Sequence, residues 1–200
     1  KDDIPKYARR QKQASYVMAV FNFTCMNVGK SKIKFSEIAD TNSQVIKSAI
    51  DLLAKANIIY PCFHTQASGL PLSLQKKENV MKLFFLDIGL LNAVQSVSAK
   101  DIMEFNGETL LNKGAMAEQF VAQHFAYFQE FSPPELFYWM NDAKVGKAEI
   151  DFVFSKEGKI FPCEVKAGSS GKLKSLWQFV LIKKSKTVIK MDLNYSNYFE

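Results

Sequence analysis

The stretch EIDFVFSKEGKIFPCEVK, residues 149–166, has the alternating pattern of a β-hairpin and decides how the rest of the chain is interpreted. Its two strand-like runs flank Glu157-Gly158, a favourable two-residue turn. Counting outward from that turn places Asp151 opposite Glu164. Alternation gathers the charged side chains of the outer half of the hairpin on one face and leaves the other face apolar.

The charged face of this hairpin needs a positive partner. Directly opposed residues of an antiparallel pair have Cα atoms roughly 5 Å apart, so two carboxylates at such positions repel each other. A divalent cation with oxygen ligands, Mg²⁺ or Mn²⁺, meets that need, so the pattern predicts Asp151 and Glu164 as metal ligands. Lys166 lies on the same face, where it would position a water or stabilise charge on phosphorus. The alternative is a solvated face, on which Glu149 opposes Lys166 in a surface ion pair.

The helix expected before the hairpin adds another carboxylate. Residues 112–128 carry apolar side chains at helical spacing, among them Val121 and Phe125. Glu118 lies three residues before Val121 and seven before Phe125, so helical geometry places it beside the apolar stripe and away from the solvent-exposed face. A carboxylate turned toward a core is costly unless it serves a site, so Glu118 joins the candidate site.

Helices and strands alternate through the second half of the chain. Helices are predicted at 112–128 and 172–183, and strands at 135–140, 148–155, 159–166 and 187–193. The order αβββαβ predicts an α/β (α+β) fold with a mixed sheet. A polar linker at 96–104 separates this domain, 105–200, from the first, 1–95.

The first half of the chain predicts a winged helix-turn-helix domain. Helical periodicity covers residues 7–28 and 43–56, with a short helix at 35–40 between them, and strand-like runs follow at 58–63 and 80–86. If the domain binds DNA, Lys47 and Lys55 would lie near phosphates and Lys76 and Lys77 would lie in the wing. Docking to another protein or domain is the alternative for such a module.

The charge distribution agrees with a polyanionic partner without requiring one. The chain has 26 Lys and Arg against 20 Asp and Glu, a net charge of +6, and most of the excess lies in the first hundred residues. A lysine-rich run at 172–190 would line a nucleic-acid groove or form a solvated face. We therefore expect DNA as a partner.

At this point the residues carry a resemblance to known families. Asp151, a gap of twelve residues and then Glu164-Val165-Lys166, preceded by a helix with an acidic residue, resembles the PD-(D/E)xK superfamily of restriction-endonuclease-like nucleases. GAMAEQFV at 114–121, FYW at 137–139, EIDF at 149–152 and EVKAG at 164–168 resemble a C-terminal domain of unknown function that follows an AAA-type ATPase module. KLFFLDIGLL at 82–91 agrees with it, and Ile150 stands where the nuclease superfamily has proline.

The resemblance implies Mg²⁺- or Mn²⁺-dependent hydrolysis of phosphodiester bonds in DNA. Its catalytic residues would be Asp151, Glu164, Lys166 and Glu118, with Asp151 and Glu164 as metal ligands and Glu149 and Gln178 as accessory residues. The competing hypothesis is a non-catalytic DNA- or protein-binding module that regulates the ATPase domain, with the acidic site a relic.

No ATP site is expected in this chain itself. Residues 24–31, TCMNVGKS, nearly match a P-loop, but Thr24 replaces the first glycine and the segment ends a helix. Because the chain starts at Lys1, we expect a fragment whose ATPase domain, with any ATP, lies upstream.

Other classes of protein are disfavoured by composition and spacing. No apolar run reaches the roughly 20 residues of a membrane span, and no signal peptide opens the chain, so a cytoplasmic protein is expected. Cys25, Cys62 and Cys163 are predicted to be buried free thiols. His64 and His124 have no partner at metal-ligand spacing.

Overall fold

The structure, a computed structural model, describes residues 11–98, 100, 113–129, 134–141, 147–168, 173–192 and 194. Its helices are α1 (Gln11–Met26), α2 (Ser43–Lys55), α3 (Ile88–Val94), α5 (Lys113–Tyr127) and α6 (Lys174–Lys183), with short 3-10 turns at Phe35–Glu37 and Leu72–Gln75. Its strands are β1 (Ile59–Thr65), β2 (Lys76–Phe85), β3 (Leu136–Asn141), β4 (Ala148–Ile150), β5 (Phe152–Lys156), β6 (Lys159–Val165) and β7 (Ile189–Met191). The predicted helices and strands are therefore found where the structure describes the chain, except that the strand predicted at 148–155 is divided and the helix predicted at 35–40 is a short 3-10 turn.

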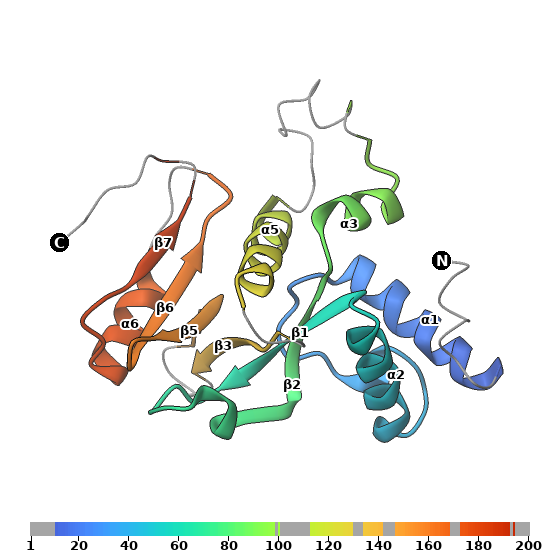
Figure 1. Ribbon diagram of the computed structural model, residues 1–200, viewed down its shortest axis with the longest axis horizontal. Coiled ribbons are helices and arrows are strands. Elements are labelled where there is room, and N and C mark those ends of the chain that lie inside the picture. The colour runs from blue at the N-terminus through green and yellow to red at the C-terminus, as the bar shows by residue number, and fades with distance from the viewer. Residues whose placement is uncertain are drawn as a thin grey trace.

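The strands form two mixed sheets. The larger sheet has the order β2-β1-β3-β4, in which β1 pairs antiparallel with β2 and parallel with β3. The smaller sheet has the order β5-β6-β7, with β6 parallel to β7. Figure 1 shows α6 beside the smaller sheet at one end of the molecule, α1 and α2 at the other end, and α5 between them. The predicted mixed α/β class is confirmed, and strands from both halves of the chain share one sheet.

The hairpin register agrees with the prediction up to the point where the first strand breaks. Phe152 pairs with Cys163 and Lys156 pairs with Lys159, as counting from the turn required. The strand predicted at 148–155 is instead two strands, because the chain bends at Asp151. β4 then pairs with β3, and Glu149 lies opposite Met140. The predicted opposition of Glu149 to Lys166 is therefore wrong.

One hydrophobic core joins the two halves of the chain. The apolar stripe of α2 is buried, and Asn42 caps this helix by accepting a hydrogen bond of 2.8 Å from the Gln44 N–H. These side chains share a cluster with residues of the second half, and the rings of Phe84 and Phe152 lie 5.6 Å apart. Because β2, α5 and β5 pack together here, the polar side chains that they carry inward must meet.

Several smaller predictions fall within or beside this core. Cys25, Cys62 and Cys163 are buried free thiols, as expected. Of the linker expected at 96–104, residues 99 and 101–104 lie outside the described residues. No helix in the part of the chain that the structure describes has the length and apolar character needed to cross a membrane.

Candidate functional site

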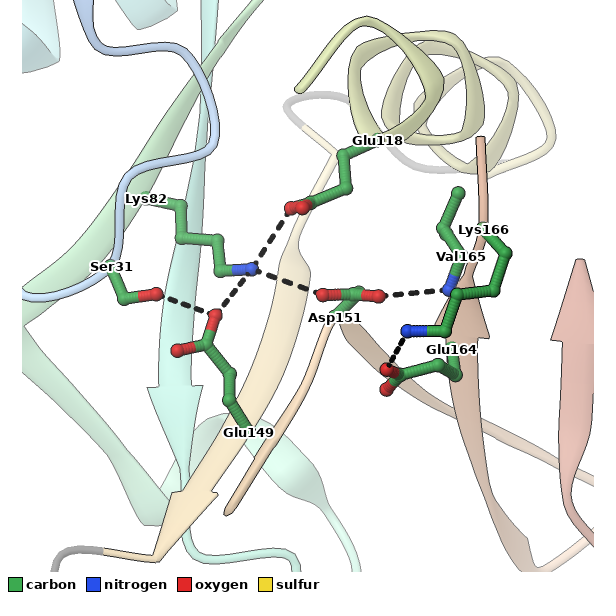
Figure 2. A network of polar contacts seen from close by, with 8 residues as sticks. All are labelled: Ser31, Lys82, Glu118, Glu149, Asp151, Glu164, Val165 and Lys166. Atoms are coloured by element: carbon green, nitrogen blue, oxygen red, sulfur yellow. Dashed lines mark hydrogen bonds and ion pairs between the residues drawn. The ribbon is translucent and has the colours of Figure 1, made fainter. Parts of the chain in front are cut away.

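The bend at Asp151 brings the two predicted metal ligands together. Asp151 lies between the end of β4 and the start of β5, and its Oδ2 accepts a hydrogen bond of 2.8 Å from the Val165 N–H (Figure 2). Val165 follows Glu164 at the end of β6, so this bond fixes Asp151 beside Glu164. The hairpin therefore joins the two carboxylates through a side-chain to main-chain bond, with no ladder pair between them.

Glu164 has one oxygen bonded and one oxygen without a donor. Its Oε1 lies 2.6 Å from Nζ of Lys166, which was predicted to share its face. Its Oε2 is buried and has no hydrogen-bond partner among the described residues. Burial and the negative charge of Asp151 raise the pKa of Glu164, because both disfavour another anion at this place. A buried acceptor without a donor costs free energy unless a cation or water binds it.

A lysine that sequence reasoning did not assign to the site lies at its centre. The side chain of Lys82, on β2, is only 1% exposed. Its Nζ lies 2.7 Å from Glu149 Oε1, 3.0 Å from Glu118 Oε2 and 3.6 Å from Asp151 Oδ1 (Figure 2). The ammonium also stands 5.3 Å from the centre of the Tyr138 ring. We call Lys82, Glu118, Glu149, Asp151, Glu164 and Lys166 the acidic cluster.

Electrostatics keep Lys82 charged. Burial alone would lower its pKa, but Glu118, Glu149 and Asp151 outweigh burial and leave the pKa well above its ordinary value. Lys82 therefore supplies positive charge to Glu118, Glu149 and Asp151, whereas Glu164 pairs with Lys166. The signal in the sequence was a lysine inside the buried run from Met81 to Phe85.

Glu118 points toward the sheet, as its place beside the apolar stripe of α5 predicted. Burial and the charge of Asp151 raise its pKa to about 7, although the ammonium of Lys82 acts in the opposite direction. The side chain bridges α5 to β2 through its bond with Lys82. The acidic cluster is thus held from three directions, by α5, by β2 and by the β4–β5 bend.

The segment that resembles a P-loop lies over this cluster. α1 ends at Met26, as expected for a segment that closes a helix, and the chain then turns at Gly29 with φ +71°. The Gly29 N–H donates to the Leu83 oxygen at 3.2 Å, and the Ser31 hydroxyl donates to Glu149 Oε1. A Cβ on Gly29 would lie 3.2 Å from Glu118 Oε2, so a glycine suits both the backbone and the space.

The remaining predicted site residues lie on other parts of the molecule. Gln178 is half-buried on α6, which packs against β4 and β6. Lys47 forms an ion pair of 3.0 Å with Glu78, and Lys76 forms one of 2.8 Å with Glu135. Lys55 and Lys77 are exposed, so two of the four candidate DNA contacts have carboxylate partners.

Neither histidine belongs to the acidic cluster. His64 is buried with Nε2 3.3 Å from the Met140 oxygen, and His124 has Nδ1 2.7 Å from the Phe120 oxygen on the same helix. Within the described ranges, no group of three or more His, Cys, Asp and Glu side chains has the geometry of a metal site.

Comparison with known protein families divides the chain at nearly the same place as the predicted linker. The model described as domain of unknown function DUF8612 matches residues 1–101, and the model described as domain of unknown function DUF4143 matches residues 113–197. Domains of the DUF4143 type are commonly associated with AAA-type ATPases, so the resemblance to such a domain of unknown function is confirmed. Searches of the curated proteins and of the solved structures returned no match.

Proposed function

The chain belongs to the family described as domain of unknown function DUF8612, and from this premise and the acidic cluster we propose that it carries a metal-dependent nuclease site for DNA. The proposed reaction is hydrolysis of a phosphodiester bond. The part that matches DUF4143 would be the nuclease module, in which the strand predicted at 148–155 is divided into β4 and β5, and the first half would be a winged-helix module. An AAA-type ATPase domain is the proposed partner.

The observation that carries this proposal is the free oxygen of Glu164. Its Oε2 is buried without a donor among the described residues, beside an aspartate that the Val165 N–H holds in place. Lys82 lies closer to Glu118 and Glu149 than to Asp151, and Lys166 contacts only Oε1 of Glu164, so the unmet acceptor lies on the Asp151–Glu164 side of the acidic cluster. Two neighbouring carboxylates with an unmet acceptor suit a hard cation that prefers oxygen ligands.

The residues therefore fit Mg²⁺ or Mn²⁺, with Asp151 and Glu164 holding the ion. Bound there, the ion would supply Lewis-acid chemistry to a phosphate group. Lys166 would release Glu164 Oε1, now 2.6 Å away, and place its ammonium against the charge that develops on phosphorus. Lys82 would keep Glu118, Glu149 and Asp151 in position.

The test compares metal binding and DNA cleavage in one set of variants. Wild type is expected to bind Mn²⁺ in calorimetry and to cleave DNA, and Asp151→Asn and Glu164→Gln are each expected to lose at least about a hundredfold in cleavage. Asp51→Asn is the matched control, because Asp51 is an exposed carboxylate on α2, and it should leave both readouts unchanged. Equal cleavage by wild type and Asp151→Asn, or a wild type that neither binds metal nor cleaves, would refute the proposal.

A second function is favoured by the place of Lys82. Because its ammonium already neutralises carboxylates from α5 and β4, most of the acidic cluster is stable without a metal ion. This suits a non-catalytic DNA- or protein-binding module that regulates an ATPase. DNA binding in EDTA by a protein without affinity for Mn²⁺ would select this second function.

A further inference from the structure

A cleft of about 380 Å³ opens at the end of the smaller sheet that is remote from the acidic cluster. Its walls come from the turn between β5 and β6, the last turn of α6, the loop before β7 and Ala67 after β1. β6 begins in the cleft at Lys159 and reaches Glu164 five residues later. At about 3.3 Å per residue, the cleft and the acidic cluster lie roughly 16 Å apart along this strand.

The cleft is lined by four lysines and by no acidic side chain. These are Lys159, Lys183, Lys184 and Lys186. None of the four forms an ion pair with a carboxylate that the structure describes, whereas Lys47 and Lys76 of the first half do. Clustered like charges repel one another and attract anions, so the cleft is a region of unneutralised positive potential.

The backbone keeps these lysines close together. α6 ends at Lys183, and Lys184 adopts a left-handed conformation with φ +54°, an uncommon one for a lysine. The Ser185 hydroxyl then donates to the Thr187 oxygen at 2.8 Å and closes a tight loop. Lys183 is partly desolvated, which lowers its pKa, and its ammonium donates to the Ser68 hydroxyl at 2.9 Å. A phosphate would replace the water that the Lys183 ammonium lacks.

The other walls of the cleft are apolar. Ile160, Phe161 and Phe179 line it, and Phe179 supports the wall from within the core, packed against Trp139 with ring centres 5.0 Å apart. The volume lies within the range of small-molecule sites, which are usually clefts with apolar walls and a few polar groups. A suitable ligand therefore carries negative charge on one part and a ring on another.

We propose that this cleft binds a nucleoside phosphate, with its phosphate against the lysines and its base or sugar against the apolar walls. A free nucleotide and one unit of a nucleic-acid strand present the same chemistry. A strand with one phosphate per 3.4 Å would reach from the cleft to the acidic cluster in about five nucleotides. Binding here needs neither a metal nor the acidic cluster, so the inference goes beyond the proposed nuclease function.

The experiment measures binding in EDTA, so that a failed nuclease proposal leaves it informative. Fluorescence anisotropy of a labelled twelve-residue oligothymidylate is recorded for wild type and for Lys184→Glu/Lys186→Glu. The double variant is expected to bind about tenfold more weakly or worse, because two attractive charges become repulsive. Lys12→Glu/Lys113→Glu is the matched control, since both lysines are exposed and lie outside the cleft, and it should stay within about twofold of wild type.

Two further measurements complete the test: displacement of the labelled strand by unlabelled ligands, and binding by variants of the predicted winged-helix surface. Displacement of the labelled strand by unlabelled thymidine monophosphate would support a free nucleotide as ligand, and displacement only by an oligonucleotide would support a strand. Lys55→Glu/Lys77→Glu tests the winged-helix surface in parallel. The inference is overturned if Lys184→Glu/Lys186→Glu binds like wild type, if only Lys55→Glu/Lys77→Glu loses binding, or if wild type binds neither ligand. Circular dichroism checks that each variant is folded.

Discussion

Lys82 and the lysines of the cleft place the same side chain in opposite surroundings. Lys82 is 1% exposed, and three carboxylates lie within 3.6 Å of its ammonium. Lys184 and Lys186 are exposed, and no described carboxylate pairs with either. The charge of Lys82 is used inside the protein to hold elements together. The ammonium groups in the cleft pair with no carboxylate in the described part of the protein and are therefore available to a bound ligand.

The comparison also shows where the two family regions depend on each other. Lys82 lies in the part that matches DUF8612, and its carboxylate partners lie in the part that matches DUF4143. Separating the regions would leave a buried lysine on one side and unpaired carboxylates on the other. The cleft, in contrast, takes nearly all of its walls from the second region.

Replacing Lys82 with methionine is expected to have the largest effect on stability. The change removes the ammonium and leaves the partly buried carboxylates of Glu118, Glu149 and Asp151 facing one another, which should lower the free energy of unfolding by about 2–4 kcal/mol. Urea unfolding measures the loss. Lys184→Met, the same change in the cleft, should stay within about 0.5 kcal/mol of wild type.

A compensating variant separates lost charge balance from lost packing. Lys82→Met/Glu118→Gln/Glu149→Gln also removes two of the carboxylates that lost their ammonium partner. It should therefore recover part of the free energy of unfolding that Lys82→Met loses. A loss of less than about 1 kcal/mol in Lys82→Met, or no recovery in the triple variant, would show that Lys82 does not hold the acidic cluster together.

The contrast between local and distant contacts explains what the sequence could predict. The alternation around Glu157-Gly158 reports on neighbours in the chain, and it predicted the hairpin register from Phe152 to Lys156 but not the bend at Asp151. The helical stripe of α5 likewise predicted the direction of Glu118. Such patterns repeat within a few residues and follow from backbone geometry alone.

The position of Lys82 depends on contacts that no local pattern encodes. β1 pairs with β3 across more than seventy residues, and this pairing brings β2 toward α5 and β4. The bend at Asp151 arises because β4 joins one sheet and β5 the other. A lysine within the apolar strand β2 was visible, but its partners were fixed only by this distant pairing. The ammonium that holds Glu118, Glu149 and Asp151 was therefore missed, and the metal ion expected at Asp151 and Glu164 stays a prediction.

Gly29→Ala is expected to have an intermediate effect, because it touches the acidic cluster without removing a charge. The added Cβ would be strained at φ +71° and would lie 3.2 Å from Glu118 Oε2. We expect a loss of about 1–2 kcal/mol in thermal or urea unfolding. Gly114→Ala is the control, because nothing lies within 4 Å of its Cβ and alanine suits a helix, so it should be neutral or slightly stabilising. Equal changes in the free energy of unfolding for Gly29→Ala and Gly114→Ala would mean that the loop at Gly29 does not pack closely against the acidic cluster.

The smallest effect on stability is expected for substitutions of the cleft lysines. The dependence of stability on salt concentration distinguishes these exposed charges from the buried charge of Lys82. Lys184→Gln/Lys186→Gln should change the free energy of unfolding by no more than about 0.5 kcal/mol, in the stabilising direction, because it relieves repulsion between neighbouring ammonium groups. Melting temperatures at low salt and at about 0.5 M NaCl measure this, since screening should remove the difference from wild type. The loss in Lys82→Met should persist at both salt concentrations, because buried charges are screened much less. If the cleft variant instead loses more than about 1 kcal/mol, its lysines support the fold as Lys82 does, and their charge is not left for a ligand.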